Sequence, residues 1–296
     1  MSIVINLPVG FEFAGKTVKE IELLPANGVA EKIYTKKLPE KPYTWQARVI
    51  SASVKSIADI PIAAKCRQEF LEHGDFTIPE AVKAMTMADM NTLLVEIHRH
   101  LWESVLPEQE FSCKFCTKVI SKTVDLFKID FLEEDKKFFE TSPDLTKIVA
   151  YLKNGFVIDG IKELDREDYV PYLSIAFNKL TYKPPTVKIA IQNERFAEDN
   201  VVFWRRIAFD SLLSIQAVEF PDTPEEKLIA ELPSDANTFL GTRFYDLYLA
   251  GKDLKIIREE LSEYLPTLPF YYIDTCPCEK AKEIPHVMEA TGFFSE

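Results

Sequence analysis

Residues 86–97, TMADMNTLLVEI, contain the pattern on which the fold prediction depends. Thr86, followed three positions later by Asp89, is similar to a capping box, in which a side-chain oxygen accepts a backbone N–H at a helix start. Apolar side chains then recur at intervals of three and four positions, at Met90, Leu93, Leu94, Ile97 and Leu101. This spacing predicts a helix that begins at Thr86 and buries one face.

A similar pattern returns later in the chain. Residues 89–94, DMNTLL, match residues 235–240, DANTFL, in their Asp, Asn, Thr and final Leu. Arg48-Val49 corresponds in the same way to Arg206-Ile207, and the two close cysteine pairs lie 163 positions apart. The order of parts favours an α+β protein of two similar halves, each with a small antiparallel sheet, helices and a cysteine knuckle. An ancient internal duplication is one interpretation, and chance similarity of short segments is the other.

The remaining segments give further local predictions. Residues 3–23 alternate apolar and polar side chains around the turn at Ala14-Gly15-Lys16, which predicts a β-hairpin. The same reasoning predicts helices over 45–60 and 203–215, a strand-like segment over 119–131 and a strand over 186–191.

The pair Ser142-Pro143 combines an N-cap with a proline at the first helical position, and Gly155 provides a stop. A helix over this segment would connect the two halves. The predicted organisation is therefore an N-terminal half over 1–141 with the first cysteine pair, a helical bridge over 142–165, and a C-terminal half over 166–296 with the second pair.

The composition restricts the partners of the protein. The chain has 296 residues, with 35 Lys and Arg against 47 Asp and Glu, and a formal net charge of −12. This charge disfavours general attraction to nucleic acid or to anionic lipid. We expect an intracellular protein without a membrane span, because the N-terminus lacks the features of a secretory signal and charges or prolines interrupt every apolar run.

The cysteines indicate a metal site. In a reducing compartment, close cysteine pairs hold metal more often than they form disulfides. Four thiolates satisfy a tetrahedral zinc ion and leave no position open for a substrate, so the predicted site is structural. The predicted ligands are Cys113, Cys116, Cys276 and Cys278, with His286 in reserve. Knuckles without metal and a redox pair are the alternatives, and Cys66 is predicted to be a small core residue.

Two motifs keep an enzyme open as the alternative function. Residues 10–17, GFEFAGKT, satisfy the phosphate-loop pattern with Lys16, but their alternation favours a hairpin. Glu96 and His100 lie four positions apart on one predicted helix face, a spacing that can bind zinc or transfer protons. A solvated polar helix face produces such pairs routinely, and we favour that interpretation.

Several of these segments together resemble the baseplate hub and hub-assembly proteins of contractile phage tails and related contractile injection systems. The resemblance covers the first 131 residues best. It is carried by LPVG at 7–10, the 86–94 helix with Ile97-His98-Arg99, FSCKFC at 111–116, and TVDL at 123–126, and in the C-terminal half by the last cysteine pair and GFF at 292–294. The second cysteine pair is tighter than the usual knuckle.

The resemblance implies a structural or assembly protein that acts by binding other tail proteins, with no catalytic residues to transfer. The expected partners are hub, tape-measure and tube proteins, and a homo-oligomer is a further expectation. The expected location is the cytoplasm of a bacterial host during assembly, or the tail of the virion.

Overall fold

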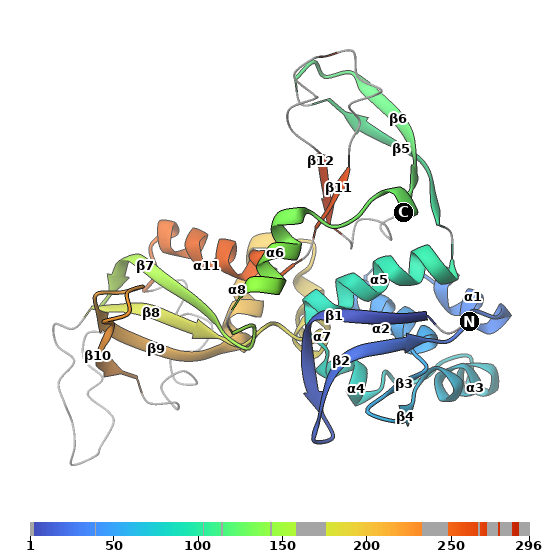
Figure 1. Cartoon of the computed structure of the whole chain (residues 1–296), viewed down its shortest axis with the longest axis horizontal. Helices are drawn as coiled ribbons and strands as arrows, with labels where there is room; N and C mark the ends of the chain where they lie inside the picture. Colours follow the sequence, from blue (N-terminus) through green and yellow to red (C-terminus); the bar gives the residue numbers. More distant parts are fainter. Residues whose placement is uncertain are drawn as a thin grey trace. The chain divides into compact units, whose positions relative to one another are not determined.

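The computed structural model divides the chain into two compact units (Figure 1). The first unit combines Met1–Pro143 with Thr186–Glu194 and Leu265–Glu296, and the second combines Asp144–Pro185 with Arg195–Tyr264. Both units contain helices and small antiparallel sheets, which confirms the predicted mixture. The residues described below are 3–38, 40–102, 104–113, 115–142, 144–157, 176–232, 248–265, 267–270, 278 and 286–289.

The first unit opens with the predicted hairpin, formed by β1 (Ile3–Phe13) and β2 (Lys16–Leu23). The pairing shifts register between Asn6 and Phe11, so β1 carries an irregular segment at this point. Gly10, in that segment, has a φ of 75°. A Cβ atom at Gly10 would lie 2.7 Å from the carbonyl oxygen of Val18, so the strand pair approaches too closely there for any other residue.

Helices pack against this hairpin to form the main core. The elements in chain order are α1 (Gly28–Thr35), α2 (Pro42–Ser53), β3 (Ser56–Ile57), β4 (Ile60–Pro61), α3 (Ala63–His73), α4 (Glu80–Ala84) and α5 (Met87–Leu101). The helix predicted over 45–60 ends at Ser53, because Val54 is extended and bridges to Leu23 at the end of β2.

The start of α5 matches the sequence prediction. The Asp89 N–H donates to Thr86 Oγ1 at 3.1 Å, and Thr86 Oγ1 donates to Asp89 Oδ2 at 2.7 Å. Asp89 is fully buried, and its Oδ1 accepts the N–H groups of Val9 and Gly10 at 3.0 and 3.1 Å. Burial raises the pKa of this carboxyl although these hydrogen bonds oppose the shift. Asp89 therefore fixes the irregular part of β1 to the first turn of α5.

The rest of the first unit comprises a second hairpin, two short helices and a pair of strands near the C-terminus. These elements are β5 (Val105–Ser112), β6 (Val119–Asp125), α6 (Glu133–Thr141), α7 (Val187–Asn193), β11 (Thr267–Phe270) and β12 (His286–Glu289). β5 pairs with β6, and β11 pairs with β12, both antiparallel.

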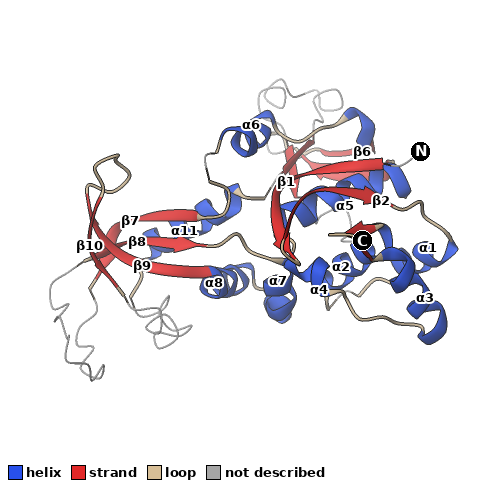
Figure 2. Cartoon of the chain, turned by 60° about the horizontal axis from the view of Figure 1, so that its bottom comes forward, coloured by secondary structure: helices blue, strands red, loops and turns tan. Residues whose placement is uncertain are grey.

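In the residues that the structure describes, the second unit has a four-stranded antiparallel sheet in the order β10-β9-β8-β7 and two longer helices (Figure 2). Its elements are β7 (Ile148–Phe156), β8 (Phe177–Tyr182), α8 (Asn200–Ser211), β9 (Leu212–Glu219), β10 (Lys227–Glu231) and α11 (Gly251–Glu263). α11 packs on β7, where Asp253 Oδ1 accepts the N–H groups of Lys153 and Asn154 at 2.9 and 3.2 Å.

The helical bridge predicted over 142–165 is wrong. Its central part is β7, in which Ile148, Ala150 and Leu152 are buried on alternate positions. Apolar side chains at 148, 150 and 152 fit a strand, whereas those at 145, 148, 149 and 152 fit a helix. Periodicity alone therefore does not distinguish a strand from a helix in this segment. Ser142 ends α6 instead of starting a helix. Residues 158–165 lie outside the described part.

Two other predicted elements differ in type or length. The strand predicted over 186–191 is the helix α7, whose N-cap Thr186 accepts the N–H of Ile189. The helix predicted over 203–215 ends at Ser211, and β9 follows without a loop. In both places tertiary packing overrides a short local pattern.

The pairing of β7 with β8 also shifts register, so β7 is a second irregular strand. Gly155, beside this shift, allows a direct test of the close approach of the two strands. Its φ is 63°, and a Cβ atom would lie 2.8 Å from the carbonyl oxygen of Phe177. We expect Gly155→Ala to lower the free energy of unfolding by about 2 to 4 kcal/mol, because strain and a backbone clash add. Gly15→Ala is the control: its φ is also positive, but nothing lies within 4 Å, so a loss of about 1 kcal/mol is expected. Equal urea-unfolding midpoints for the two variants would contradict the close approach.

Candidate metal centre

The first cysteine pair lies in the turn that joins β5 to β6. The Cys113 N–H donates to the carbonyl of Lys118 at 2.8 Å, and the Thr117 N–H donates to the carbonyl of Cys113 at 2.9 Å. Thr117 adopts a left-handed φ of 56°, an uncommon conformation for a β-branched residue. This tight turn places Cys113 and Cys116, which are three positions apart in the sequence, close to each other in one loop.

Cys278 completes a group of three thiols with this pair. The sulfur atoms of Cys113, Cys116 and Cys278 all lie within 4.8 Å of one another. Cys113 is buried and the other two are partly exposed. In a tetrahedral site with Zn–S bonds of about 2.3 Å, neighbouring sulfur atoms are about 3.8 Å apart. The three thiols are therefore close enough to hold one metal ion after small adjustments of their side chains.

The group joins segments far apart in the sequence. Cys278 lies between β11 and β12, 162 positions after Cys116. Cys276, the fourth predicted ligand, lies outside the described residues. His286 pairs with Phe270 through the backbone of β12. The three described thiols thus bring together the 105–125 hairpin and the C-terminal segment of the same unit.

Among the residues that the structure describes, no other group of three His, Cys, Asp or Glu side chains is close enough to hold a metal ion. Cys66 lies in the main core on α3, and burial raises the pKa of its thiol to about 11. Its placement confirms the prediction of a core residue, and such a thiol is a poor nucleophile and a poor metal ligand at neutral pH.

The phosphate-loop pattern is part of the first hairpin, as its alternation predicted. Residues 10–17 contain the end of β1, the turn at Ala14-Gly15 and the start of β2, and no helix follows Lys16. Lys16 forms an ion pair with Asp59, and Thr17 donates a hydrogen bond to Glu12. The backbone N–H groups that would surround a phosphate are instead part of a β-ladder.

Glu96 and His100 lie on one face of α5, as expected from their spacing, but other groups occupy the carboxylate. Glu96 accepts from Arg99 at 2.6 Å, and its second oxygen lies 3.3 Å from His100 Nε2. Arg99 also donates to the carbonyl of Leu126 at 3.0 Å. These interactions connect α5 to the turn after β6, which is a structural use of the pair.

A second aspartate, Asp253, makes hydrogen bonds like those of Asp89, and no sequence pattern predicted this. Asp235, which the sequence matched to Asp89, lies outside the described residues. Asp253 is the third residue of its helix, as Asp89 is, and it also accepts two consecutive backbone N–H groups, those of Lys153 and Asn154. The residue before α11 is Ala250, so the capping oxygen that marked Thr86 is absent there. The glycine and phenylalanine at 10–11 and at 155–156 were the available sequence clue.

No helix in the described part of the chain is both long enough and apolar enough to cross a membrane. Comparison with protein-family models, with curated proteins and with solved structures finds no match.

Proposed function

We propose that this protein is a structural or assembly component of a contractile phage tail baseplate or hub, which acts by binding other tail proteins and contains one structural zinc ion. The observation that carries the proposal is the group formed by Cys113, Cys116 and Cys278. With Cys276 as the fourth thiolate, the ion would have a complete tetrahedral shell and no position for a substrate.

In this proposal the zinc supplies stability and no chemistry. Metal binding is coupled to folding, because the ligands converge only in the folded chain. Cys113 and Cys116 hold the ion from the hairpin turn, and Cys278 holds it from the C-terminal segment. The ion therefore fixes that segment to the hairpin.

Exposed apolar side chains along the β5–β6 hairpin support an association function. Val105, Phe115, Val119 and Phe127 all belong to the β5–β6 hairpin or the turn after it, and each exposes more than a third of its side chain. Single exposed apolar residues are ordinary, but several on one small element are typical of interaction sites. The metal would keep this hairpin rigid, so that binding costs little ordering entropy.

The partners follow from the resemblance of the sequence to hub and hub-assembly proteins. We propose hub, tape-measure or tube proteins as the partners, in a bacterial host cytoplasm during assembly or in the finished tail. The acidic net charge of −12 agrees with a protein partner and not with nucleic acid.

Co-expression with hub, tape-measure and tube proteins of a contractile tail tests the proposal. We expect a stable complex with one of them, weakened at least tenfold by Phe115→Glu combined with Val119→Glu. Leu71→Glu is the matched control, because Leu71 is equally exposed but lies on α3. Failure to bind any tail protein would contradict the proposal. So would a gene neighbourhood of metabolic enzymes, if the protein also turned over a small molecule and His100→Ala abolished that turnover.

We also propose that the two units derive from a duplicated ancestor. In both, an antiparallel strand pair shifts register beside a glycine of positive φ, at Gly10 and at Gly155. In both, the third residue of a later helix is a buried aspartate, Asp89 or Asp253. Its carboxylate accepts two consecutive backbone N–H groups from the irregular strand. An experimental structure in which β1, β2, α2 and α5 fail to superpose on β7, β8, α8 and α11 would contradict this origin.

A further inference from the structure

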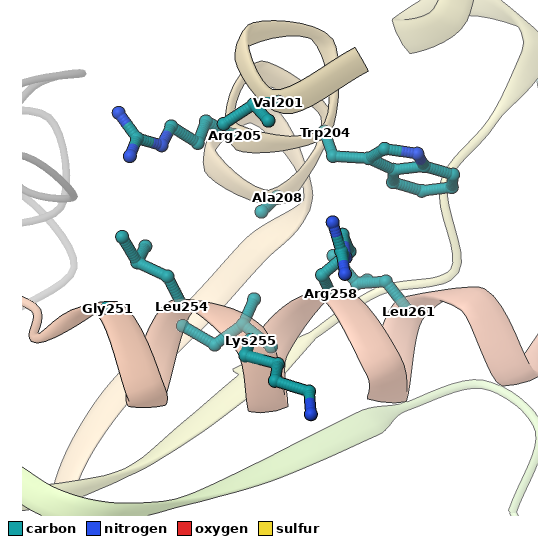
Figure 3. Close-up of a pocket in the computed structure, with 10 residues that line it drawn as sticks. Val201, Trp204, Arg205, Ala208, Gly251, Leu254, Lys255, Arg258 and Leu261 are labelled. Atoms are coloured by element: carbon teal, nitrogen blue, oxygen red, sulfur yellow. The ribbon is translucent and has the colours of Figure 1, made fainter.

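A groove of about 320 Å³ runs between α8 and α11 in the second unit (Figure 3). Val201, Trp204 and Ala208 line it from α8, and Leu254, Ile257 and Leu261 line it from α11. Ala208, Ile257 and Leu261 are buried and form the floor, whereas Val201 is half exposed. The spacing of these side chains along each helix makes the groove two to three helical turns long.

Among the residues that the structure describes, the charged side chains that line the groove are all cationic. They are Arg205, Lys255 and Arg258. Figure 3 shows Arg258 rising from α11 toward Trp204 on α8, while Lys255 points away from α8. In a chain with a net charge of −12, these described lining residues provide local complementarity to carboxylates.

The first unit shows what covers the comparable face there. In the duplication proposed above, α2 and α5 would correspond to α8 and α11, because both pairs follow an irregular strand pair and carry the buried aspartates Asp89 and Asp253. α7 contacts both α2 and α5. Its residues Val187 and Ala190 are fully buried, and Val187 donates its N–H to the carbonyl of Met85 at 2.9 Å.

The covering helix also provides a carboxylate at its C-terminal end. Glu194 accepts the backbone N–H of Thr44 at 2.9 Å and the hydroxyl of the same residue at 2.5 Å, at the beginning of α2. α7, a helix of two turns with aliphatic side chains and a terminal carboxylate, therefore packs on α2, α4 and α5 together.

We infer that the α8–α11 groove binds a short helical segment of a partner protein, with aliphatic side chains one turn apart and carboxylates beside them. The inference rests on the proposed association function but names a different surface from the β5–β6 hairpin. The aliphatic side chains pack on Val201, Trp204 and the groove floor, and the carboxylates pair with Arg258. This is recognition of an amphipathic helix in a groove.

A helix-forming peptide of about 14 residues, with leucines one turn apart flanked by glutamates, is the probe. Fluorescence anisotropy with the full-length protein should show saturable binding that weakens with salt, since charge pairs contribute. A peptide with lysines in place of the glutamates should bind at least tenfold more weakly. Arg258→Glu should weaken binding of the glutamate peptide at least tenfold, and Val201→Asp should weaken it at least fivefold.

Lys252→Glu is the matched control, because Lys252 is exposed on the same helix, undergoes the same change of charge and does not line the groove. Equal binding of the two peptides, equal effects of Arg258→Glu and Lys252→Glu, or no saturation at about 1 mM glutamate peptide would overturn the inference. Self-association in sedimentation that Arg258→Glu abolishes would assign the groove to a second copy instead and would also overturn it. Because these variants leave the β5–β6 hairpin unchanged, complex formation with tail proteins tests the proposed function separately.

Discussion

Replacing Cys113 by serine is expected to abolish stoichiometric zinc binding, from one ion per chain to a small residual fraction. Cys113 is the buried member of the three-thiol group, and its turn is fixed by backbone hydrogen bonds to Lys118 and Thr117. Serine leaves the turn in place but supplies a poor zinc ligand. Because apparent binding energies of structural zinc are about 10 to 16 kcal/mol in small folded sites, loss of the ion should unfold the region that it holds.

Metal analysis and hydrogen exchange of the full-length protein check this expectation. Amides of residues 105–125 should exchange at least tenfold faster in Cys113→Ser than in the parent, and a chelator should produce the same change in the parent protein. Cys66→Ser should retain the zinc, because Cys66 lies in the main core away from the group. Zinc content that is independent of Cys113, or exchange in the hairpin that a chelator does not change, would contradict the clamp.

Asp89→Ala is expected to destabilise the first unit by about 3 to 5 kcal/mol. The Asp89 carboxylate accepts the N–H groups of Val9 and Gly10 and the hydroxyl of Thr86. Alanine removes these acceptors and leaves buried donors without partners, and it detaches the irregular part of β1 from α5. Urea unfolding of the full-length protein measures the loss. A change below about 1 kcal/mol would show that the carboxylate does not hold the hairpin.

Asp89→Asn separates the hydrogen bonds from the charge. The amide oxygen can still accept from Val9 and Gly10, so we expect a smaller loss than for alanine. Burial raises the pKa of Asp89 above the ordinary value near 3.8, so the folded state binds its proton more tightly than the unfolded state does. Ionisation of Asp89 should therefore cost the parent protein stability as the pH rises from about 4 through the folded-state pKa, so the stability of the parent relative to Asp89→Asn should fall over this range. A constant stability difference between the two proteins across this range would contradict the shift.

The parts of the fold that the sequence predicted correctly are those with a local chemical cause. The Thr86 cap and the apolar stripe predicted α5, and the alternation of 3–23 predicted the first hairpin. For the site, close cysteine spacing predicted that Cys113 and Cys116 would meet Cys278. In a reducing compartment, a close pair of thiols holds metal more often than it forms a disulfide. Two such pairs can therefore indicate one shared site even when they are far apart in the sequence.

The parts that the sequence did not predict depend on contacts between distant residues. The sequence of β7 fits a helix and a strand equally well, and its pairing with β8 decides between them. The role of Asp253 depends on β7, which lies about 100 positions earlier in the chain. The α8–α11 groove arises from the packing of two helices that are separated by two strands, and no local pattern marks it.

The ligand set of the proposed zinc ion tests the central claim most directly. Zinc X-ray absorption on the purified full-length protein should show four sulfur ligands at about 2.3 Å and no oxygen or nitrogen ligand. Such a closed shell is what a clamp between the β5–β6 hairpin and the C-terminal segment requires. Three sulfur ligands with a bound water, or a protein that binds no zinc at all, would contradict the account.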